Sequence, residues 1–323
     1  MPKAIRIHAP GGPDVLHWEE VEVGEPGPGQ SRLRQEVAGL NFIDVYHRKG
    51  QYPQPMPFIP GVEGAGIIEA VGEGVTHVAP GDRVAYGGPA GGYAEERLID
   101  ADRVVKLPDS ISSEQAAGMM LQGMTAQMLV RAVFPIAKGD IILVHAAAGG
   151  VGLILTQWAA AIGATVIGTV STEEKAELAS AHGCAHPIIH KRQDFVAEVK
   201  RLTDGEKLPV VYDSVGRDTF LRSLDCLRPR GLMVSFGQSS GIVEPLAINL
   251  LGQKGSLYLT RPTLYHYIDR RAQLEQCAAE LFAMVAEGKV KVEVQQRFPL
   301  SHAADAHRAL EARETTGSTV LTI

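Results

Sequence analysis

The sequence predicts an α/β protein with a β-rich, barrel-like domain and a doubly wound parallel-sheet domain. Three observations predict it. The length of 323 residues corresponds to about two ordinary domains. Short apolar runs broken by Gly and Pro fill residues 1 to about 122, whereas strand-like and helix-like segments alternate from about 123 to 262. A glycine-rich loop, VHAAAGGVG at 144–152, directly follows an apolar run.

The β-rich part has strand signals at residues 4–9, 33–40, 64–72 and 82–86, separated by turn-forming stretches such as PGPGQ and APGD. This pattern is typical of a compact, barrel-like antiparallel domain. In the alternating part, apolar strands are expected at 140–146, 164–170, 186–190, 210–216, 232–237 and 256–260. Such alternation predicts a parallel sheet with right-handed crossovers. A helix at 272–289 and a strand–helix–strand segment ending in STVLTI follow.

Composition and charge restrict the class of protein. Hydrophobic residues make up 45% and charged residues 21%, which is ordinary for a globular protein. A net charge of −6 and a pI near 6.0 argue against a broad nucleic-acid-binding surface. The N-terminus lacks the apolar region of a secretory signal, and Cys184, Cys226 and Cys277 are scattered. We therefore expect a reduced, cytoplasmic compartment.

Residues 141–172 contain no Asp, Glu, Lys or Arg and are numerous enough to cross a bilayer. Glycines, His145 and Gln157 interrupt this stretch, which divides into strand, loop, helix and strand. Parallel strands covered on both faces are continuously apolar. We therefore expect a buried strand–helix–strand unit and not a membrane span.

The glycine loop matches A-x-G-x-x-G at Ala147, Gly149 and Gly152, one substitution from the dinucleotide-binding fingerprint. Gly149 would let the backbone approach a diphosphate, and Gly152 would let the helix pack closely on the strand. A helix beginning near Gly150 would direct its amides and positive dipole end at the phosphates. The strand before and the helix after the loop favour this interpretation over a turn that serves packing alone.

The end of the second strand of this domain indicates the kind of nicotinamide cofactor. An acid that selects NAD is expected there, yet the strand ends in Val170, Ser171 and Thr172. Two hydroxyls and the nearby Lys175 suit a 2′-phosphate, which needs donors and positive charge. NADPH is therefore favoured over NADH, although a lone lysine on a helix is commonly only solvated.

The run AHGCAHPIIH contains His182, Cys184, His186 and His190, which together suggest a zinc site. Gly183 and Pro187 interrupt any helix that could bring these side chains to one face. We expect a helix end, a turn and the third strand instead. His190, at the end of that strand, would lie near the adenosine end of a cofactor.

The domain order, together with GVEGAGIIEAVGEGV, PGDRVAYGG and VHAAAGGVG, resembles the medium-chain dehydrogenase/reductase superfamily over essentially the whole chain. NFIDVYHRKGQYP, YDSVGRDT, SFGQSSG and SLYLTRPTL resemble more specifically its bacterial NADPH:quinone oxidoreductases, which are related to zeta-crystallin. The resemblance implies a GroES-like catalytic domain, residues 1–122 and 263–323, and a Rossmann NADPH-binding domain, residues 123–262.

Departures from the zinc-dependent members are informative. Asn41 stands where those members have a Cys ligand, and Val62 stands where they have a His ligand. Because zinc needs several N or S ligands, the chain resembles the zinc-independent branch and no metal is expected. Gln122 and His190 differ from the Lys and Tyr of some bacterial relatives, so the contacts of these two residues remain open.

The resemblance also implies the residues that contact the cofactor and a pairing of subunits. The family usually dimerises through an edge strand of the Rossmann sheet, and SLYLT at 256–260 is the candidate edge. The cofactor contacts that it implies are Asn41, Thr125, Ala148, Gly149, Gly150, Val151, Ser171, Lys175, His190, Ser214, Phe236, Gln238, Arg261 and Arg313.

Reduction of a quinone needs hydride or electrons from the nicotinamide, and fixed donors to stabilise a developing negative oxygen. Asn41, Tyr46 and Tyr52 are the candidate catalytic residues. The alternative is that Asn41 merely caps a turn and that each tyrosine merely packs in the protein. Arg261 could contact cofactor or substrate. Reduction of α,β-unsaturated carbonyls is the enzymatic alternative, and an NADPH-binding or RNA-binding protein without turnover is the non-enzymatic one.

Overall fold

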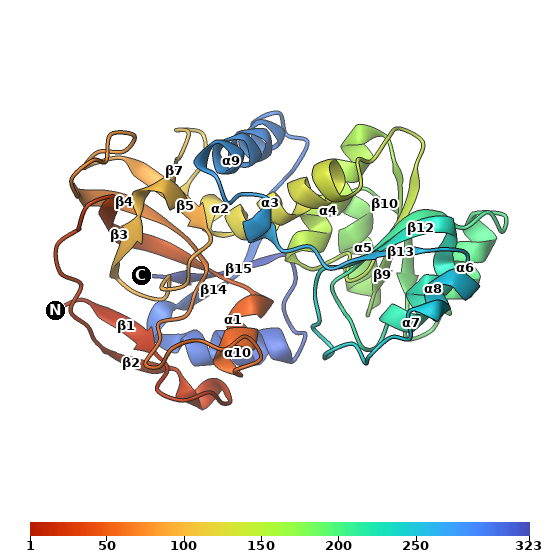
Figure 1. Ribbon diagram of the computed structural model, residues 1–323, viewed down its shortest axis with the longest axis horizontal. Coiled ribbons are helices and arrows are strands. Elements are labelled where there is room, and N and C mark those ends of the chain that lie inside the picture. Colours follow the sequence, from red (N-terminus) through yellow and green to blue (C-terminus); the bar gives the residue numbers. More distant parts are fainter. The chain divides into compact units, whose positions relative to one another are not determined.

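The computed structural model describes residues 1–323, which divide into two compact units (Figure 1). Unit 1 comprises Met1–Met124, Ile268–Ala286 and Val292–Ile323, and unit 2 comprises Thr125–Tyr267 and Glu287–Lys291. The sequence-based borders fall after residues 122 and 262, whereas the borders of the compact units follow Met124 and Tyr267. The return of Glu287–Lys291 to unit 2 has a local cause, because the Gln157 side chain bonds the backbone N–H and C=O of Lys291 at 2.8 and 3.1 Å.

Unit 1 contains a seven-stranded sheet in which segments from both ends of the chain are neighbours (Figure 1). The strand order is β14-β15-β3-β4-β5-β7, and β6 also pairs with β3. The strands are β3 (Gln30–Leu40), β4 (Glu63–Val71), β5 (Arg83–Gly87), β6 (Glu96–Asp100), β7 (Val105–Lys106), β14 (Val294–Pro299) and β15 (Ser318–Thr322). A separate antiparallel pair is formed by β1 (Lys3–Arg6) and β2 (His17–Glu20).

The sheet of unit 1 is not purely antiparallel. Strands β14 and β15 run parallel, whereas every other neighbouring pair is antiparallel. Helix α10 (Ala303–Glu311) connects β14 to β15, and such a crossover is what a parallel pair requires. The remaining helices of this part are α1 (Phe42–Arg48), α2 (Ser113–Ala117), α3 (Met120–Met128), which continues into unit 2, and α9 (Arg271–Ala286).

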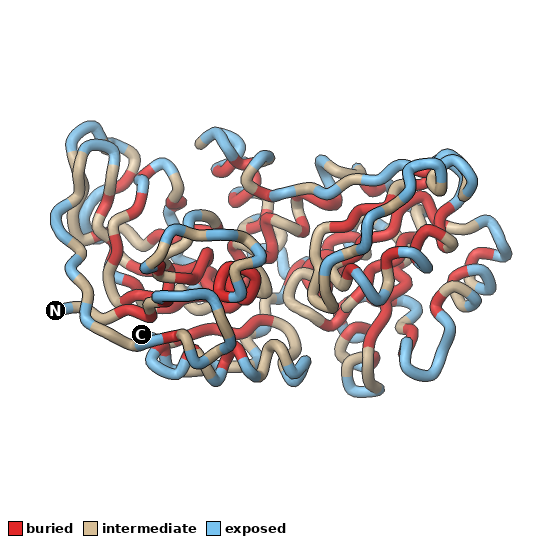
Figure 2. The backbone as a smooth tube through the Cα atoms, turned by 60° about the horizontal axis from the view of Figure 1, so that its bottom comes forward, coloured by how far each residue is buried: buried red, intermediate tan, exposed pale blue.

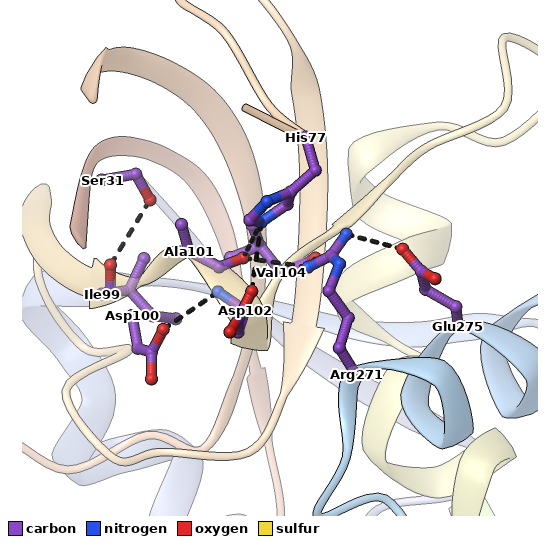
Figure 3. Close-up of polar contacts among 9 residues, drawn as sticks. All are labelled: Ser31, His77, Ile99, Asp100, Ala101, Asp102, Val104, Arg271 and Glu275. Atoms are coloured by element: carbon purple, nitrogen blue, oxygen red, sulfur yellow. Dashed lines mark hydrogen bonds and ion pairs between the residues drawn. The ribbon is translucent and has the colours of Figure 1, made fainter. Parts of the chain in front are cut away.

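The Arg271 side chain attaches the first turn of α9 to the turn that follows β6, as Figure 3 shows. Arg271 donates to the carbonyl oxygens of Ala101 and Val104, at 3.1 and 3.2 Å, and pairs with Glu275 one turn later at 2.8 Å. The ring of His77 lies 2.8 Å from the same Ala101 oxygen. Arg103 donates to the carbonyl of Ile268 just before the helix. The chain is thus fixed where it re-enters unit 1.

Unit 2 is a doubly wound parallel sheet with the strand order β10-β9-β8-β11-β12-β13. The strands are β8 (Ile141–Val144), β9 (Thr165–Val170), β10 (Cys184–Ile189), β11 (Leu208–Asp213), β12 (Leu227–Ser235) and β13 (Tyr258–Thr260). The helices are α4 (Gly150–Ile162), α5 (Glu173–Ala181), α6 (Phe195–Leu202), α7 (Phe220–Ser223) and α8 (Asn249–Gln253).

The central strands of unit 2 are buried on both faces, and Figure 2 shows their backbone almost entirely as buried. All six residues of β11 are buried, which explains why the run LPVVYD is apolar up to its final Asp. The charge-free residues 141–172 form β8, α4 and β9. No helix in the structure has both the length and the apolar composition to cross a bilayer.

Local sequence signals set the ends of the helices in unit 2. Helix α4 ends at Gly163, whose φ of 99° is left-handed and therefore favours glycine. Helix α5 begins after Thr172, whose hydroxyl accepts the N–H of Lys175 at 3.3 Å. Asp194 caps α6 in the same way through the N–H groups of Val196 and Ala197.

The order of the strands defines where a ligand would bind in unit 2. From β8 the chain first proceeds outward through β9 and β10, then returns to place β11 on the other side of β8. In open parallel sheets, ligands bind beyond the carboxyl ends of the strands at this reversal. The glycine loop follows β8, and Asp213 ends β11, so both lie at the reversal.

Candidate active site

The glycine loop forms a tight turn between β8 and α4. Ala146 has a φ of 53°, and its carbonyl accepts the N–H of Gly149 at 2.9 Å. Gly149 is the N-cap of α4 in an extended conformation, and no side chain caps the first turn. Gly150 and Val151 occupy that first turn and are partly exposed. The amides at the start of this 13-residue helix are therefore available to an anion.

Two glycines of the loop have different packing roles. A Cβ on Gly152 would stand 2.3 Å from the oxygen of Ala146, so only glycine lets α4 approach the loop this closely. A Cβ on Gly149 would stand 3.3 Å from the same oxygen, which is tight but less severe. This cradle fits the diphosphate of a dinucleotide, because the loop offers backbone N–H groups and no side-chain carboxylate.

The predicted adenosine-end residues lie at the carboxyl ends of β9 and β10. Ser171 follows β9, and the backbone N–H of His190 donates to the carbonyl of Val170 at 3.1 Å, so these two ends are adjacent. Lys175 lies in the first turn of α5, and its side chain is partly buried. Arg192 supplies a further cation just after β10 and pairs with Glu173 at 3.2 Å. Arg192 was not predictable from the sequence, because it lies in a turn without a motif.

Ser214, Phe236 and Gln238, three of the predicted cofactor contacts in unit 2, lie on two loops that pack together, and Arg261 bonds to one of these loops. Arg261 donates from Nη1 to the carbonyls of Ser235 and Gly237, both at 2.9 Å, and from Nη2 to Gln238. The loop after β12 packs on Ser214, because a Cβ on Gly237 would stand 2.6 Å from the Ser214 oxygen. Arg261 therefore fixes the loop that carries Phe236 and Gln238, whatever else it contacts.

Three other predicted contacts lie outside these two loops. Thr125 is partly exposed on α3 at the start of unit 2, and Ala148 is a buried residue of the glycine loop. Arg313 belongs to unit 1, is exposed, and has a left-handed φ of 62° just after α10.

Asn41 in unit 1 is buried within a network of polar side chains. Its Nδ2 donates to Glu63 Oε2 at 2.6 Å, and its Oδ1 accepts from Gln122 Nε2 at 3.2 Å. Glu63 also accepts the backbone N–H of Leu121 at 2.7 Å. Gln122 in turn lies 2.9 Å from the Ser318 hydroxyl. Asn41, which is only 8% exposed, is therefore fixed by residues of three further elements.

Asp44 connects the same turn to the C-terminal helix α10. Its Oδ2 accepts the backbone N–H of Asn41 at 2.9 Å and the hydroxyl of Tyr93 at 3.1 Å. Arg48 can only donate, so Nδ1 of His307, 3.0 Å away, is the acceptor and the ring proton is on Nε2. This Nε2–H donates to Tyr93 at 3.2 Å, which leaves the Tyr93 proton for Asp44.

Burial governs the titration of these groups. Desolvation raises the pKa of Asp44 to about 7 and that of Glu63 to about 8, although hydrogen bonds to each carboxyl oppose the shift. Burial, assisted by the charge of Arg48, lowers the pKa of His307 to about 3, which agrees with the neutral tautomer. Unit 1 thus contains two carboxyl groups that titrate near neutral pH.

Tyr46 in α1 and Tyr52 shortly after that helix are neighbours. Their ring centroids are 5.4 Å apart in an edge-to-face arrangement, and the N–H of Tyr52 donates to the Tyr46 carbonyl. Tyr46 is buried, whereas Tyr52 is partly exposed. Both rings pack as an aromatic pair, and each hydroxyl remains a candidate donor.

No three His, Cys, Asp or Glu side chains lie close enough together to hold a metal ion. His182, Cys184, His186 and His190 are not brought together: His182 is buried and bonds the Leu178 carbonyl, whereas His186 and His190 are exposed. Cys184 is buried on β10.

Several buried polar residues that organise the candidate groups within each unit were not predicted from the sequence. Asp213 accepts the N–H groups of Val215 and Gly216 and the hydroxyl of Thr219, which shapes the loop of Ser214. Glu63 and Asp44 were also missed. Their signal was present, because each is an acid within an apolar run, GVEGAG and NFIDVY.

Family models and similar proteins agree with this geometry. The model of the zinc-binding dehydrogenases matches residues 150–282, and that of the alcohol dehydrogenase GroES-like domain matches residues 27–109. The chain is 51% identical to a quinone oxidoreductase of Pseudomonas aeruginosa over 323 residues, covering 99% of each protein. The chain belongs to the quinone oxidoreductases of the medium-chain dehydrogenase/reductase superfamily.

Solved structures extend the comparison within this quinone oxidoreductase family. The Escherichia coli quinone oxidoreductase, solved in complex with NADPH, superposes with a TM-score of 0.98 at 47% identity and covers 99% of this chain and 100% of its own. A 2-haloacrylate reductase of a Burkholderia species is 47% identical over 99% of each protein. The family therefore combines one fold with more than one named reductase activity.

Proposed function

We propose that this protein is an enzyme that reduces quinones with NADPH and needs no metal ion. The observation that carries the proposal is the glycine loop at the start of α4, in a chain that matches named quinone oxidoreductases over its full length. When bound, NADPH supplies the hydride for the reduction. The protein must hold the cofactor, orient the quinone and stabilise negative charge on its oxygen.

The residues of unit 2 would hold the cofactor. The amides of Gly149, Gly150 and Val151 would bind the diphosphate, with Ala148 beneath them. Ser171, Lys175 and His190 would bind the 2′-phosphate, which supports NADPH over NADH because no carboxylate ends β9. The remaining proposed contacts with the cofactor are Thr125, Ser214, Phe236, Gln238, Arg261 and Arg313, together with Asn41.

The residues of unit 1 would act on the quinone. Asn41 offers an amide fixed by Glu63 and Gln122, and a fixed donor stabilises charge without first reorganising. Tyr46 and Tyr52 offer two hydroxyl donors on adjacent rings. The hydride brings one of the two hydrogens of the quinol, and the one remaining proton needs no dedicated acid because water can supply it.

The decisive test is steady-state oxidation of NADPH with a series of quinones and a parallel series of α,β-unsaturated carbonyls. The proposal expects turnover with quinones, and a kcat/KM with NADPH that exceeds the value with NADH. Turnover of the unsaturated carbonyls with none of the quinones would refute it.

Reduction of activated alkenes is a second candidate activity. The Burkholderia relative, named a 2-haloacrylate reductase, is nearly as similar to this chain as the named quinone oxidoreductases, at 47% identity. Both reactions place negative charge on an oxygen conjugated to the acceptor carbon, so the same fixed donors serve both. A 2-haloacrylate belongs in the substrate panel for this reason.

We also propose a cytoplasmic homodimer formed through the edge of the unit 2 sheet. Strand β13 is the last strand of that sheet, and Tyr258 and Leu259 on it are 60% and 40% exposed. An exposed apolar edge is suited to pairing with a second copy. Sedimentation of the wild-type protein and of Leu259→Lys is the test. We expect the wild type to be a dimer and the variant to be a monomer, and a monomeric wild type would refute the proposal.

A further inference from the structure

Four buried side chains in unit 1 form a continuous chain of polar contacts that runs from Glu63 to Ser318. Glu63, Asn41, Gln122 and Ser318 are 0%, 8%, 5% and 3% exposed. Successive polar atoms are 2.6, 3.2 and 2.9 Å apart. The four residues come from β4, the N-cap of α1, α3 and β15. Neither amide can therefore change its contacts independently of the other.

At the Ser318 end of this chain, two acceptor oxygens compete for one hydroxyl proton. The Ser318 hydroxyl lies 2.6 Å from the carbonyl oxygen of Gly118 and 2.9 Å from Gln122 Oε1. A hydroxyl has one proton and can donate to only one of these two acceptors. When Ser318 donates to Gly118, no hydrogen lies between Ser318 Oγ and Gln122 Oε1.

Turning over both amides removes the conflict. An amide oxygen and nitrogen occupy nearly the same space, so a turned amide keeps its packing. In the turned arrangement, Asn41 Nδ2 donates to Gln122 Oε1, and Gln122 Nε2 donates to Ser318 Oγ. The Ser318 proton then serves Gly118 alone. This arrangement requires one more proton, on Glu63 Oε2, which donates to Asn41 Oδ1.

The shortest separation in the chain also suits the turned arrangement. Glu63 Oε2 lies 2.6 Å from the terminal amide atom of Asn41. Bonds from N–H to oxygen are typically about 2.7–3.2 Å long, whereas those from O–H to oxygen are about 2.5–3.0 Å long. An oxygen of Asn41 facing a protonated Glu63 fits this separation better than a nitrogen does.

We propose that Glu63 is a positioning residue for the reaction: its proton sets the direction of the hydrogen bonds from Glu63 through Asn41 and Gln122 to Ser318. That direction decides which side of Asn41 carries the N–H donors. The inference rests on the proposed function only for its effect on catalysis, because the coupling between Glu63 and Asn41 exists without substrate.

The surroundings allow Glu63 to change its protonation near physiological pH. Its carboxyl contacts the side-chain amide of Asn41 and the backbone N–H groups of Leu121 and Gln122. Burial raises its pKa to about 8. Asp44 on α1 raises the pKa further by its charge. The other titratable groups that interact with Glu63 are the phenols of Tyr86 on β5 and Tyr93, and no cation is bonded to its carboxyl.

The protonated form of Glu63 is the active one. Reduction creates negative charge on a substrate oxygen, and an ionised Glu63 would place a second negative charge one hydrogen bond from Asn41. Protonation removes that charge and completes the four hydrogen bonds of the chain. The rate of reduction therefore decreases as pH rises through the titration of Glu63.

The test uses asparagine labelling, because the chain has only two asparagines, Asn41 and Asn249. In ¹⁵N-asparagine-labelled protein, we expect the side-chain amide signal of Asn41 to shift with a midpoint near pH 8, because burial raises the pKa of Glu63 to about 8. Asn249 is exposed on α8 and serves as an internal control that stays constant. In Glu63→Gln the new amide donates permanently to Asn41, so the Asn41 signal should not titrate in that window.

Kinetics with NADPH and a quinone provide the second measurement. The wild-type kcat/KM is expected to decrease about tenfold or more across the titration, whereas Glu63→Gln keeps a flat profile over the same range. Asp44→Asn is the matched control, since it removes a neighbouring buried carboxyl: the decrease should persist and move to lower pH.

The outcomes separate the inference from the proposed function. A wild-type Asn41 signal that ignores pH, or a titration that survives in Glu63→Gln, overturns the coupling. A titrating signal in an enzyme whose quinone rate is independent of pH overturns the positioning role. A titrating signal in a protein that reduces no quinone refutes the proposed function and leaves the coupling between Glu63 and Asn41 intact.

Discussion

The carbonyl oxygen of Ala146 lies against the α-carbon of Gly152, where a methyl group would stand only 2.3 Å away. The oxygen cannot retreat freely, because it accepts the N–H of Gly149 and belongs to a turn with a left-handed φ at Ala146. This contact couples the shape of the glycine loop to the position of α4.

Gly152→Ala is therefore expected to move the loop away from the helix amides. We expect a loss of about 1–3 kcal/mol in the free energy of unfolding of unit 2, which is typical of overpacking. Binding of NADPH should weaken at least about tenfold, measured by fluorescence titration.

Gly252→Ala on α8 is the matched control, because a Cβ there meets nothing within 4 Å. It should leave NADPH binding unchanged and stabilise α8 by up to about 1 kcal/mol. If Gly152→Ala bound NADPH as tightly as Gly252→Ala does, the diphosphate would not rest on this loop.

Lys175→Ala is expected to weaken NADPH binding much more than NADH binding. A charge-assisted hydrogen bond contributes about 1.5–3 kcal/mol, which corresponds to about 10- to 100-fold in Kd for the phosphorylated cofactor alone. Titration with both cofactors measures the difference. Lys200→Ala, on the exposed face of α6, is the control for a lost lysine. Equal losses for NADPH and NADH would remove Lys175 from the 2′-phosphate site.

The raised pKa values of Asp44 and Glu63 predict how stability depends on pH. A carboxyl whose pKa is higher in the folded protein stabilises the fold fully below its unfolded pKa, and this contribution is lost as pH rises through the folded pKa. For Glu63 the window runs from 4.5 to about 8, and for Asp44 from 3.8 to about 7.

Urea unfolding of the wild type and of Glu63→Gln across this window is the measurement. The variant should gain stability relative to the wild type as pH rises to about 8 and hold a constant difference above it. A difference that stayed constant from acid to alkaline pH would contradict the raised pKa of Glu63.

Arg271 is expected to contribute to the stability of unit 1 through the carbonyls of Ala101 and Val104. Arg271→Ala should lower the free energy of unfolding by about 1–3 kcal/mol, because two inward-facing carbonyls lose a charged donor. Arg270→Ala, which is exposed beside it, should change stability by less than about 0.5 kcal/mol. Similar effects of the two variants would show that water replaces the Arg271 contacts.

The fold class was predictable because the pattern of apolar residues indicates which segments are buried, and the Gly and Pro residues between them indicate where these segments end. The apolar runs at 140–146, 164–170 and 210–216 contain β8, β9 and most of β11, and SLYLT contains the terminal strand β13. The parallel pairing of β14 and β15 was not predictable from the signals of individual strands, since register and direction depend on the path of α10.

The candidate site was only partly predictable, for a physical reason. The glycine loop has a local signature, because the constraint on Gly152 comes from residues six positions or fewer away. The network at Asn41 joins residues separated by up to 277 positions, from Asn41 to Ser318, and no local pattern encodes such a set. A buried acid in an apolar run, as at Glu63, was the available clue.

The position of β15 affects how the polypeptide acquires its structure during synthesis. This strand lies between β14 and β3, and its first residue, Ser318, completes the chain of polar groups at Asn41. Since residues 318–322 follow every other strand of both sheets along the chain, unit 2 can fold on the emerging polypeptide while the sheet of unit 1 still lacks an interior strand. The sheet of unit 1 therefore stays incomplete until β15 has been synthesised, and a chain that stops at Gly317 would leave a gap between β14 and β3.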